Sequence, residues 1–111
     1  AAVARNSQSS SWVLERLAND RDSEIRLAVA SHSNASENTL LLLAGDYNEQ
    51  IRSQVARRKN LPSSVMRRLA SDNNSSVRLL IARRTDTPAS VLRQMVNDSD
   101  LNVLTTVLNE F

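Results

Sequence analysis

The chain of 111 residues has no cysteine, one glycine, two prolines and three aromatic residues. Without cysteine, the sequence excludes disulfides, thiolate zinc sites, iron–sulfur clusters and thiol nucleophiles within this chain. This is compatible with a reducing compartment, and we expect a cytoplasmic location. Strands need many turns built on glycine and proline, so the scarcity of both residues favours helices. With so few aromatic residues, the core must consist of Leu, Val, Ile and Ala.

Long hydrophobic runs and recognisable catalytic sets are also missing. No apolar stretch approaches the ~18 residues that a membrane span needs, so we expect no membrane association. One histidine without cysteine predicts neither a metal site nor a Ser–His–acid set, and the single glycine excludes a glycine-rich phosphate loop. We therefore predict a protein that is not an enzyme and that has no cofactor and no metal.

What the sequence does contain is an internal repeat with a period of 26 residues. Apolar, alanine and aspartate positions recur in register over most of the chain. The clearest columns are Ala4, Ala30, Ala56 and Ala82; Leu14, Leu40, Met66 and Leu92; Leu17, Leu43, Leu69 and Met95; Asp20, Asp46, Asp72 and Asp98; Ile25, Ile51, Val77 and Val103; and Val29, Val55, Ile81 and Val107. We expect one domain over residues 1–111, with units at 4–29, 30–55, 56–81 and 82–107, and with 1–3 and 108–111 as parts of flanking units.

Each unit contains two short helical patterns. In the third unit the first pattern covers about residues 62–71 and the second about residues 75–83. Pro62 and Pro88 stand where a helix starts, a position that tolerates the missing N–H, and we expect Thr87 to cap its helix. Helices of about ten residues are marginal when isolated. They persist when neighbouring units bury a shared apolar face, so we expect the Leu17 column to point into a core.

These columns resemble the leucine-rich repeat variant family of bacterial proteins. The best matching stretches are A-R-R-K-N-L-P-S-S-V-M-R-R-L-A-S-D-N-N-S-S-V-R-L-L-I-A at 56–82, T-D-T-P-A-S-V-L at the start of 85–98, and Val3-Ala4-Arg5-Asn6. The resemblance implies an all-α fold without a β-sheet, in which an α-helix alternates with a shorter, often 3₁₀, helix in a right-handed superhelix, an α-solenoid. HEAT-like repeats are similar. The chain departs from the family at Ser10 and Ser36, where proline is missing.

Charge is concentrated in the middle of the chain. Residues 52–93 carry ten basic and two acidic groups, whereas residues 1–51 and 94–111 are each net −3. A basic surface attracts phosphates or acidic protein surfaces, and arginine suits bidentate contacts to either. The candidate partner-binding residues are Arg57, Arg58, Arg67, Arg68, Arg83, Arg84 and Arg93.

A structural role for the same arginines is the alternative. Arginines at helix C-termini meet the negative end of the helix dipole. Arg52 and Arg78 recur six residues after Asp46 and Asp72, which resembles the Asp–Arg ladders that link units in related solenoids. No aromatic residue is interleaved with the basic cluster, which disfavours base stacking.

Trp12 replaces Asn and Ser in its column, so it covers an end face, packs on a preceding unit or contacts a partner. Stacked repeats offer an extended binding surface. We expect a non-catalytic scaffold that binds another protein, with nucleic-acid or phosphate binding through the arginine-rich central units as the alternative.

Overall fold

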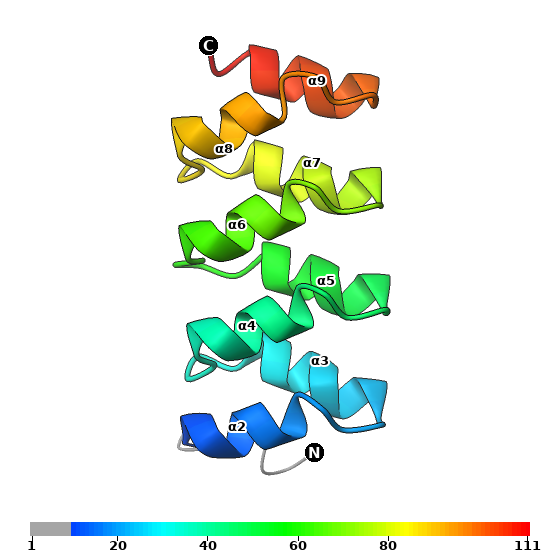
Figure 1. Ribbon diagram of the computed structural model, residues 1–111, viewed down its shortest axis with the longest axis vertical. Helices are drawn as coiled ribbons and strands as arrows, with labels where there is room; N and C mark the ends of the chain where they lie inside the picture. Colours follow the sequence, from blue (N-terminus) through cyan, green and yellow to red (C-terminus); the bar gives the residue numbers. More distant parts are fainter. Residues whose placement is uncertain (1–9) are drawn as a thin grey trace.

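The computed structural model describes residues 10–111, and in that range the chain is all-α, with eight helices and no strand (Figure 1). The predicted segment 1–3 and the start of the first unit, residues 4–9, lie outside the described residues. The helices are α2 (Ser11–Leu17), α3 (Ser23–Ser31), α4 (Glu37–Leu43), α5 (Glu49–Ala56), α6 (Ser63–Leu69), α7 (Ser75–Arg83), α8 (Ala89–Gln94) and α9 (Leu101–Leu108). Within the described range, none of these helices has the length and apolar character needed to cross a bilayer.

The helices lie in two columns (Figure 1). One column holds α3, α5, α7 and α9, each in contact with the next, and α4, α6 and α8 make successive contacts in the other. Helices adjacent in the sequence, such as α4 and α5, also contact each other. The chain measures 42 × 22 × 16 Å. The units follow one another along the longest dimension, because equivalent helices of successive units contact each other.

The turn inside each unit is built by two side chains that accept backbone hydrogen bonds in succession. Asp46 Oδ1 accepts from the N–H of Asn48, and Asn48 Oδ1 accepts from the N–H of Gln50, both at 2.9 Å. The second bond caps α5, since Asn and Asp favour this position. The other units have the same pair of bonds. The two accepting residues are Asp20 and Asp22, Asp72 and Asn74, and Asp98 and Asp100.

The first helix of each unit starts differently. Ser36 caps α4 by accepting from the N–H of Thr39 at 3.2 Å. Pro62 and Pro88 occupy the N-cap positions of α6 and α8, without a side-chain cap bond. The expectation that Thr87 caps its helix is wrong: its hydroxyl donates to the Ile81 carbonyl at 2.7 Å. Thr87 precedes the N-cap, and the Ile81 carbonyl near the end of α7, which also accepts from the N–H of Arg84, lies within its reach.

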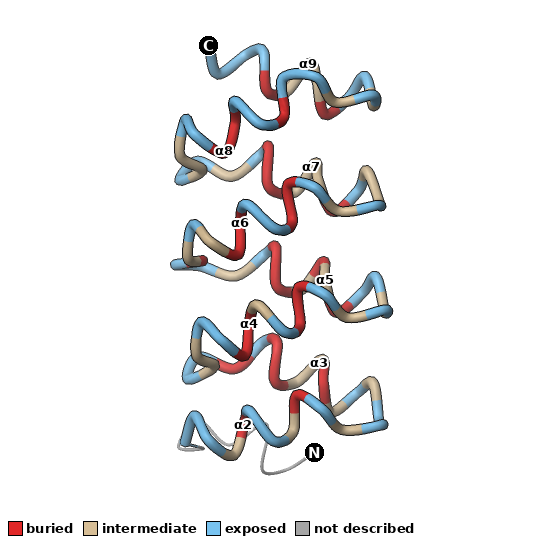
Figure 2. Tube along the Cα trace, in the orientation of Figure 1, coloured by how far each residue is buried: buried red, intermediate tan, exposed pale blue. Residues whose placement is uncertain are grey.

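The core lies between the two columns (Figure 2). Leu43, Leu69 and Met95 are at most 1% exposed, which confirms the prediction for these members of their column. Leu17 packs against the core but is only partly buried. It belongs to the first helix described, so only one neighbouring unit of the described chain covers it.

Candidate functional site

Three arginines join successive units into a ladder. The Nε atoms of Arg26, Arg52 and Arg78 each lie 2.8 Å from Oδ2 of an aspartate twenty residues later in the sequence. The pairs are Arg26–Asp46, Arg52–Asp72 and Arg78–Asp98. The structure thus contains the predicted ladder, with the carboxylate supplied by the next unit.

The aspartate six residues upstream takes part through its backbone. Arg52 Nη1 donates to the carbonyl of Asp46 at 2.7 Å, and Arg78 Nη1 donates to the carbonyl of Asp72 at 2.8 Å. Each guanidinium therefore ties the turn of its own unit to the carboxylate of the next. The fold supplies hydrogen-bond acceptors for the guanidinium groups of these arginines, so we assign these side chains to the linkage of one unit to the next.

Titration of Asp98 reports on one ladder pair. Burial raises the pKa of Asp98, but the hydrogen bond from Arg78, the N–H of Asp100 and the Arg78 charge outweigh it, and the net pKa is lowered. A carboxyl whose folded pKa is depressed stabilises the fold above its unfolded pKa of about 3.9, and this contribution is lost as pH falls through the folded pKa.

We therefore expect Asp98→Asn to destabilise the protein near neutral pH. The difference from the wild type should shrink as pH falls below about 4 and through the lowered pKa of Asp98. Urea unfolding followed by circular dichroism over a pH series measures this. A difference that stays constant with pH would contradict the assignment.

Two of the predicted site residues, Arg58 and Arg84, occupy one column and bind backbone carbonyls of the preceding unit. Arg58 Nη1 donates to the carbonyls of Ala30 and His32, each at 2.8 Å. Arg84 Nη1 donates to the carbonyls of Ala56 and Arg58 at 2.9 and 2.6 Å. Both arginines thus meet the negative C-terminal end of a helix, as predicted, but of the helix one unit earlier.

Arg58 and Arg84 differ in the hydrogen-bond partners of their other guanidinium nitrogens. Arg84 Nε and Nη2 donate to the two carboxylate oxygens of Asp86, each at 2.9 Å, and this hydrogen bonding lowers the pKa of Asp86. At the corresponding place after Arg58 the chain has Asn60. Arg58 Nε is buried and has no hydrogen-bond partner among the described residues, and burial lowers the pKa of Arg58.

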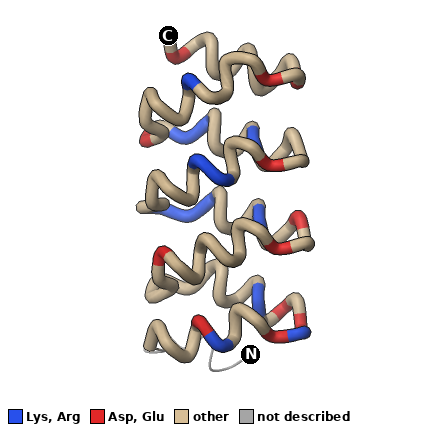
Figure 3. The backbone as a smooth tube through the Cα atoms, in the orientation of Figure 1, with Lys and Arg blue, Asp and Glu red and all other residues tan. Residues whose placement is uncertain are grey.

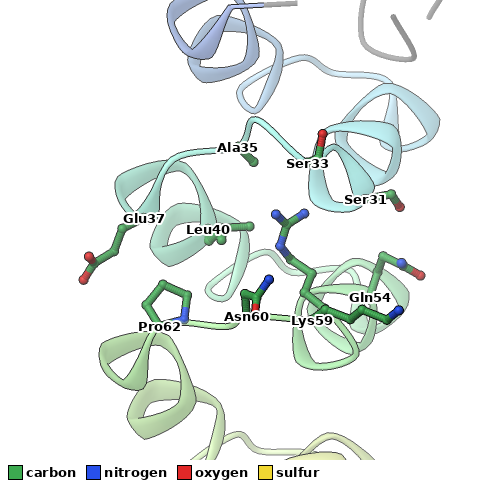
Figure 4. Close-up of a pocket in the computed structure, with 10 residues that line it drawn as sticks. Ser31, Ser33, Ala35, Glu37, Leu40, Gln54, Lys59, Asn60 and Pro62 are labelled. Atoms are coloured by element: carbon green, nitrogen blue, oxygen red, sulfur yellow. The ribbon is translucent and has the colours of Figure 1, made fainter. Parts of the chain in front are cut away.

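Arg58 borders two hollows, each of about 400 Å³. The first runs between α3, α4 and the turn after α5, and Figure 4 shows Asn60 pointing into it. Its lining residues are Ser31, Ser33, Ala35, Glu37, Leu40, Gln54, Arg58, Lys59, Asn60 and Pro62. The second hollow is lined by Arg57, Arg58, Lys59, Asn60, Arg84, Thr85 and Asp86. Three of the seven predicted site arginines therefore meet at one depression.

The other predicted arginines lie elsewhere. Arg83, at the end of α7, is exposed, as are Arg67 on α6 and Arg93 on α8. Arg68 is also exposed and lies so close to Gly45 that a Cβ there would collide with its guanidinium. Figure 3 shows basic positions both on α6 and α8 and on the turns leading into these helices. The seven arginines are thus divided between two kinds of location.

Exposed hydrophobic and aromatic residues were largely missed by sequence reasoning. Tyr47 is 84% exposed, and its ring centroid lies 5.1 Å from the Arg26 guanidinium carbon, a cation–π contact over the ladder. Its signal was that it stands in a column otherwise held by Arg, Asn and Ser. Trp12, which the sequence did single out, is 65% exposed. Leu101, Leu108 and Phe111 are exposed at the C-terminal end.

The described residues contain no cluster of three or more His, Asp or Glu side chains placed to hold a metal ion. His32 is buried at the end of α3, where its Nδ1 accepts from the N–H of Asn34 at 3.0 Å. The chemistry that the arrangement offers is hydrogen bonding and charge on a surface. In comparisons with known proteins, no family model, no curated protein and no solved structure matches the chain.

Proposed function

We propose that this chain is a right-handed α-solenoid of four 26-residue helix-pair repeats, similar to the leucine-rich repeat variant family, that acts as a non-catalytic scaffold binding another protein. Support for the repeat comes from the ladder, whose three pairs each span twenty residues. Further support comes from the contacts between equivalent helices along each column. Such stacking presents similar side chains at regular intervals on one surface.

The observation that carries the binding role is the extended face over α6 and α8, where exposed side chains recur at regular intervals. A body 42 Å long and 22 Å wide offers enough area for a standard interface of about 800 Å² per partner. Arg67 and Arg93 recur on it at equivalent positions of α6 and α8. Exposed arginine favours an acidic partner.

Nucleic acid is the alternative partner, and the ladder and carbonyl contacts weaken it. Four of the ten basic side chains in residues 52–93 bind aspartates or backbone carbonyls of the fold, namely Arg52, Arg58, Arg78 and Arg84. The remaining six are exposed, but they are divided between α6 and α8, the end of α7 and the turn after α5. A protein surface of mixed acidic groups can match such separated positions.

Charge reversal on the face tests the proposal. The partner captured from cells is purified and its binding to the purified chain is measured directly. We expect Arg67→Glu with Arg93→Glu to weaken binding at least tenfold. Arg16→Glu with Arg21→Glu is the matched control, since both residues are exposed outside the basic stretch, and it should change binding less than about threefold.

Nucleic acid is tested in parallel with a labelled duplex and a labelled single strand at low and moderate salt. A phosphate-binding module loses affinity steeply as salt rises. Tight duplex or single-strand binding with that salt dependence, together with no purified protein partner, would overturn the proposal in favour of the alternative.

A further inference from the structure

Arg58 and Arg84 differ in whether Nε of the guanidinium has a hydrogen-bond acceptor. Both residues use Nη1 to bind carbonyls of the preceding unit. Arg84 then pairs Nε and Nη2 with Asp86, two residues later. Arg58 has Asn60 two residues later, and its Nε lacks any hydrogen-bond partner in the described part of the chain. A buried donor without an acceptor is costly, so the site favours a ligand that supplies one.

The two acids that line the hollows beside Arg58 are bonded to other groups. Asp86, in the second hollow, accepts from Nε and Nη2 of Arg84. Glu37 lines the first hollow, but Figure 4 shows it pointing away from Asn60, and its Oε2 accepts from the Ser64 hydroxyl at 2.5 Å. Lys59, which lines the same hollow, adds a second positive charge. The region thus combines two cations with acids that are engaged elsewhere.

We propose that Arg58, assisted by Lys59, binds a carboxylate from an acidic side chain of the protein partner. The carboxylate binds the edge of the Arg58 guanidinium that corresponds to the edge Arg84 uses for Asp86. Because Nε of Arg58 is buried in the free chain, binding requires the side chains that cover it to move aside. This inference rests on the proposed function, because it identifies where on the scaffold the partner docks.

An acidic peptide suits the hollow better than a phosphate group on nucleic acid. The lining includes the apolar groups of Ala35, Leu40 and Pro62, which can pack against aliphatic neighbours of a glutamate. No aromatic side chain lines it to stack on a base. The planar, bidentate geometry that the chain itself uses at Arg84 is that of a carboxylate.

The test is a titration read at one atom. An acetylated, amidated peptide of sequence Ala-Leu-Glu-Leu-Ala is added to the labelled full chain, and the Nε–Hε resonance of Arg58 is followed by NMR. We expect a saturable shift with a Kd of about 1 mM. The same peptide with Gln in place of Glu should bind at least tenfold more weakly, since it lacks the charge.

Two reciprocal substitutions keep the carbonyl contacts of both arginines intact. Asn60→Asp supplies an internal carboxylate and should weaken peptide binding at Arg58 about tenfold. Asn60 has φ 56°, a conformation that aspartate also tolerates. Asp86→Asn removes the internal carboxylate from Arg84, and the Arg84 Nε–Hε resonance should then respond to the Glu peptide. Asn97→Asp, at an exposed position, adds the same charge elsewhere and should change binding less than about twofold.

Equal responses to the Glu and Gln peptides would overturn the proposal, as would equal weakening by Asn60→Asp and Asn97→Asp. Tighter binding of inorganic phosphate or of a single strand at Arg58 would also overturn it, by assigning the site to phosphate. The result is separable from the proposed function. The Arg58 resonance could show no specific response to the Glu peptide while charge reversal at Arg67 and Arg93 still weakens partner binding at least tenfold. In that case the scaffold role stands and only this docking point is wrong.

Discussion

Asp72→Ala is expected to lower the free energy of unfolding by about 3 kcal/mol, because it leaves the Arg52 charge partly buried without its carboxylate. The Asp72 side chain is 5% exposed and that of Arg52 is 16% exposed. Asp72 accepts from Nε and Nη2 of Arg52 and from the N–H of Asn74. The substitution therefore removes both a link between units and a bond of the turn.

Asp20→Ala is the control that separates these two losses. Asp20 accepts from the N–H of Asp22 in the same kind of turn, at 2.8 Å. Among the described residues, no arginine forms a salt bridge with its carboxylate. We expect a cost of about 1 kcal/mol for this variant. Urea unfolding followed by far-ultraviolet circular dichroism compares the two, and equal costs would show that the ladder adds nothing to the turn.

Leu69→Ala is expected to lower the free energy of unfolding by about 2–5 kcal/mol, because a fully buried leucine is replaced by a cavity. Leu69 is 0% exposed and ends α6. Units on both sides cover it, since α6 contacts both α4 and α8. Because α6 has only seven residues, packing rather than intrinsic propensity maintains it.

Leu42→Ala is the matched control on the equivalent helix of the preceding unit. Leu42 is 47% exposed, so the same change of side chain should cost less than about 1 kcal/mol. Thermal unfolding and urea unfolding both measure the comparison. A similar loss for the two variants would show that burial in the stacked core does not govern stability.

Local rules explain why much of the fold could be predicted. The Leu43 and Leu69 column repeats at a fixed spacing, and an apolar position at helical period must be buried for so short a helix to persist. The turn aspartates follow from short-range chemistry, because their side chains reach the backbone two residues ahead. Each of these features involves residues within one turn of each other or in one column.

The candidate site was only partly predictable, because its contacts cross between units. Arg58 and Arg84 look alike in the sequence, and both bind carbonyls at least 26 residues earlier. The distinction between them depends on a neighbour two residues away, Asn60 or Asp86, whose importance shows only once the guanidinium has been placed. Similarly, nothing in the order of residues indicates that Arg68 lies over Gly45.

The sequence by itself determined the helical class, the 26-residue period, the buried columns and the turn chemistry. These follow from period, propensity and short side-chain reach, which are properties of neighbouring residues. Only the tertiary structure decided that Arg52 pairs with Asp72 of the next unit and that Arg58 is left with an unpaired donor. Both outcomes depend on how one unit stacks on another, because a hydrogen bond forms only at the distance and angle that this packing sets.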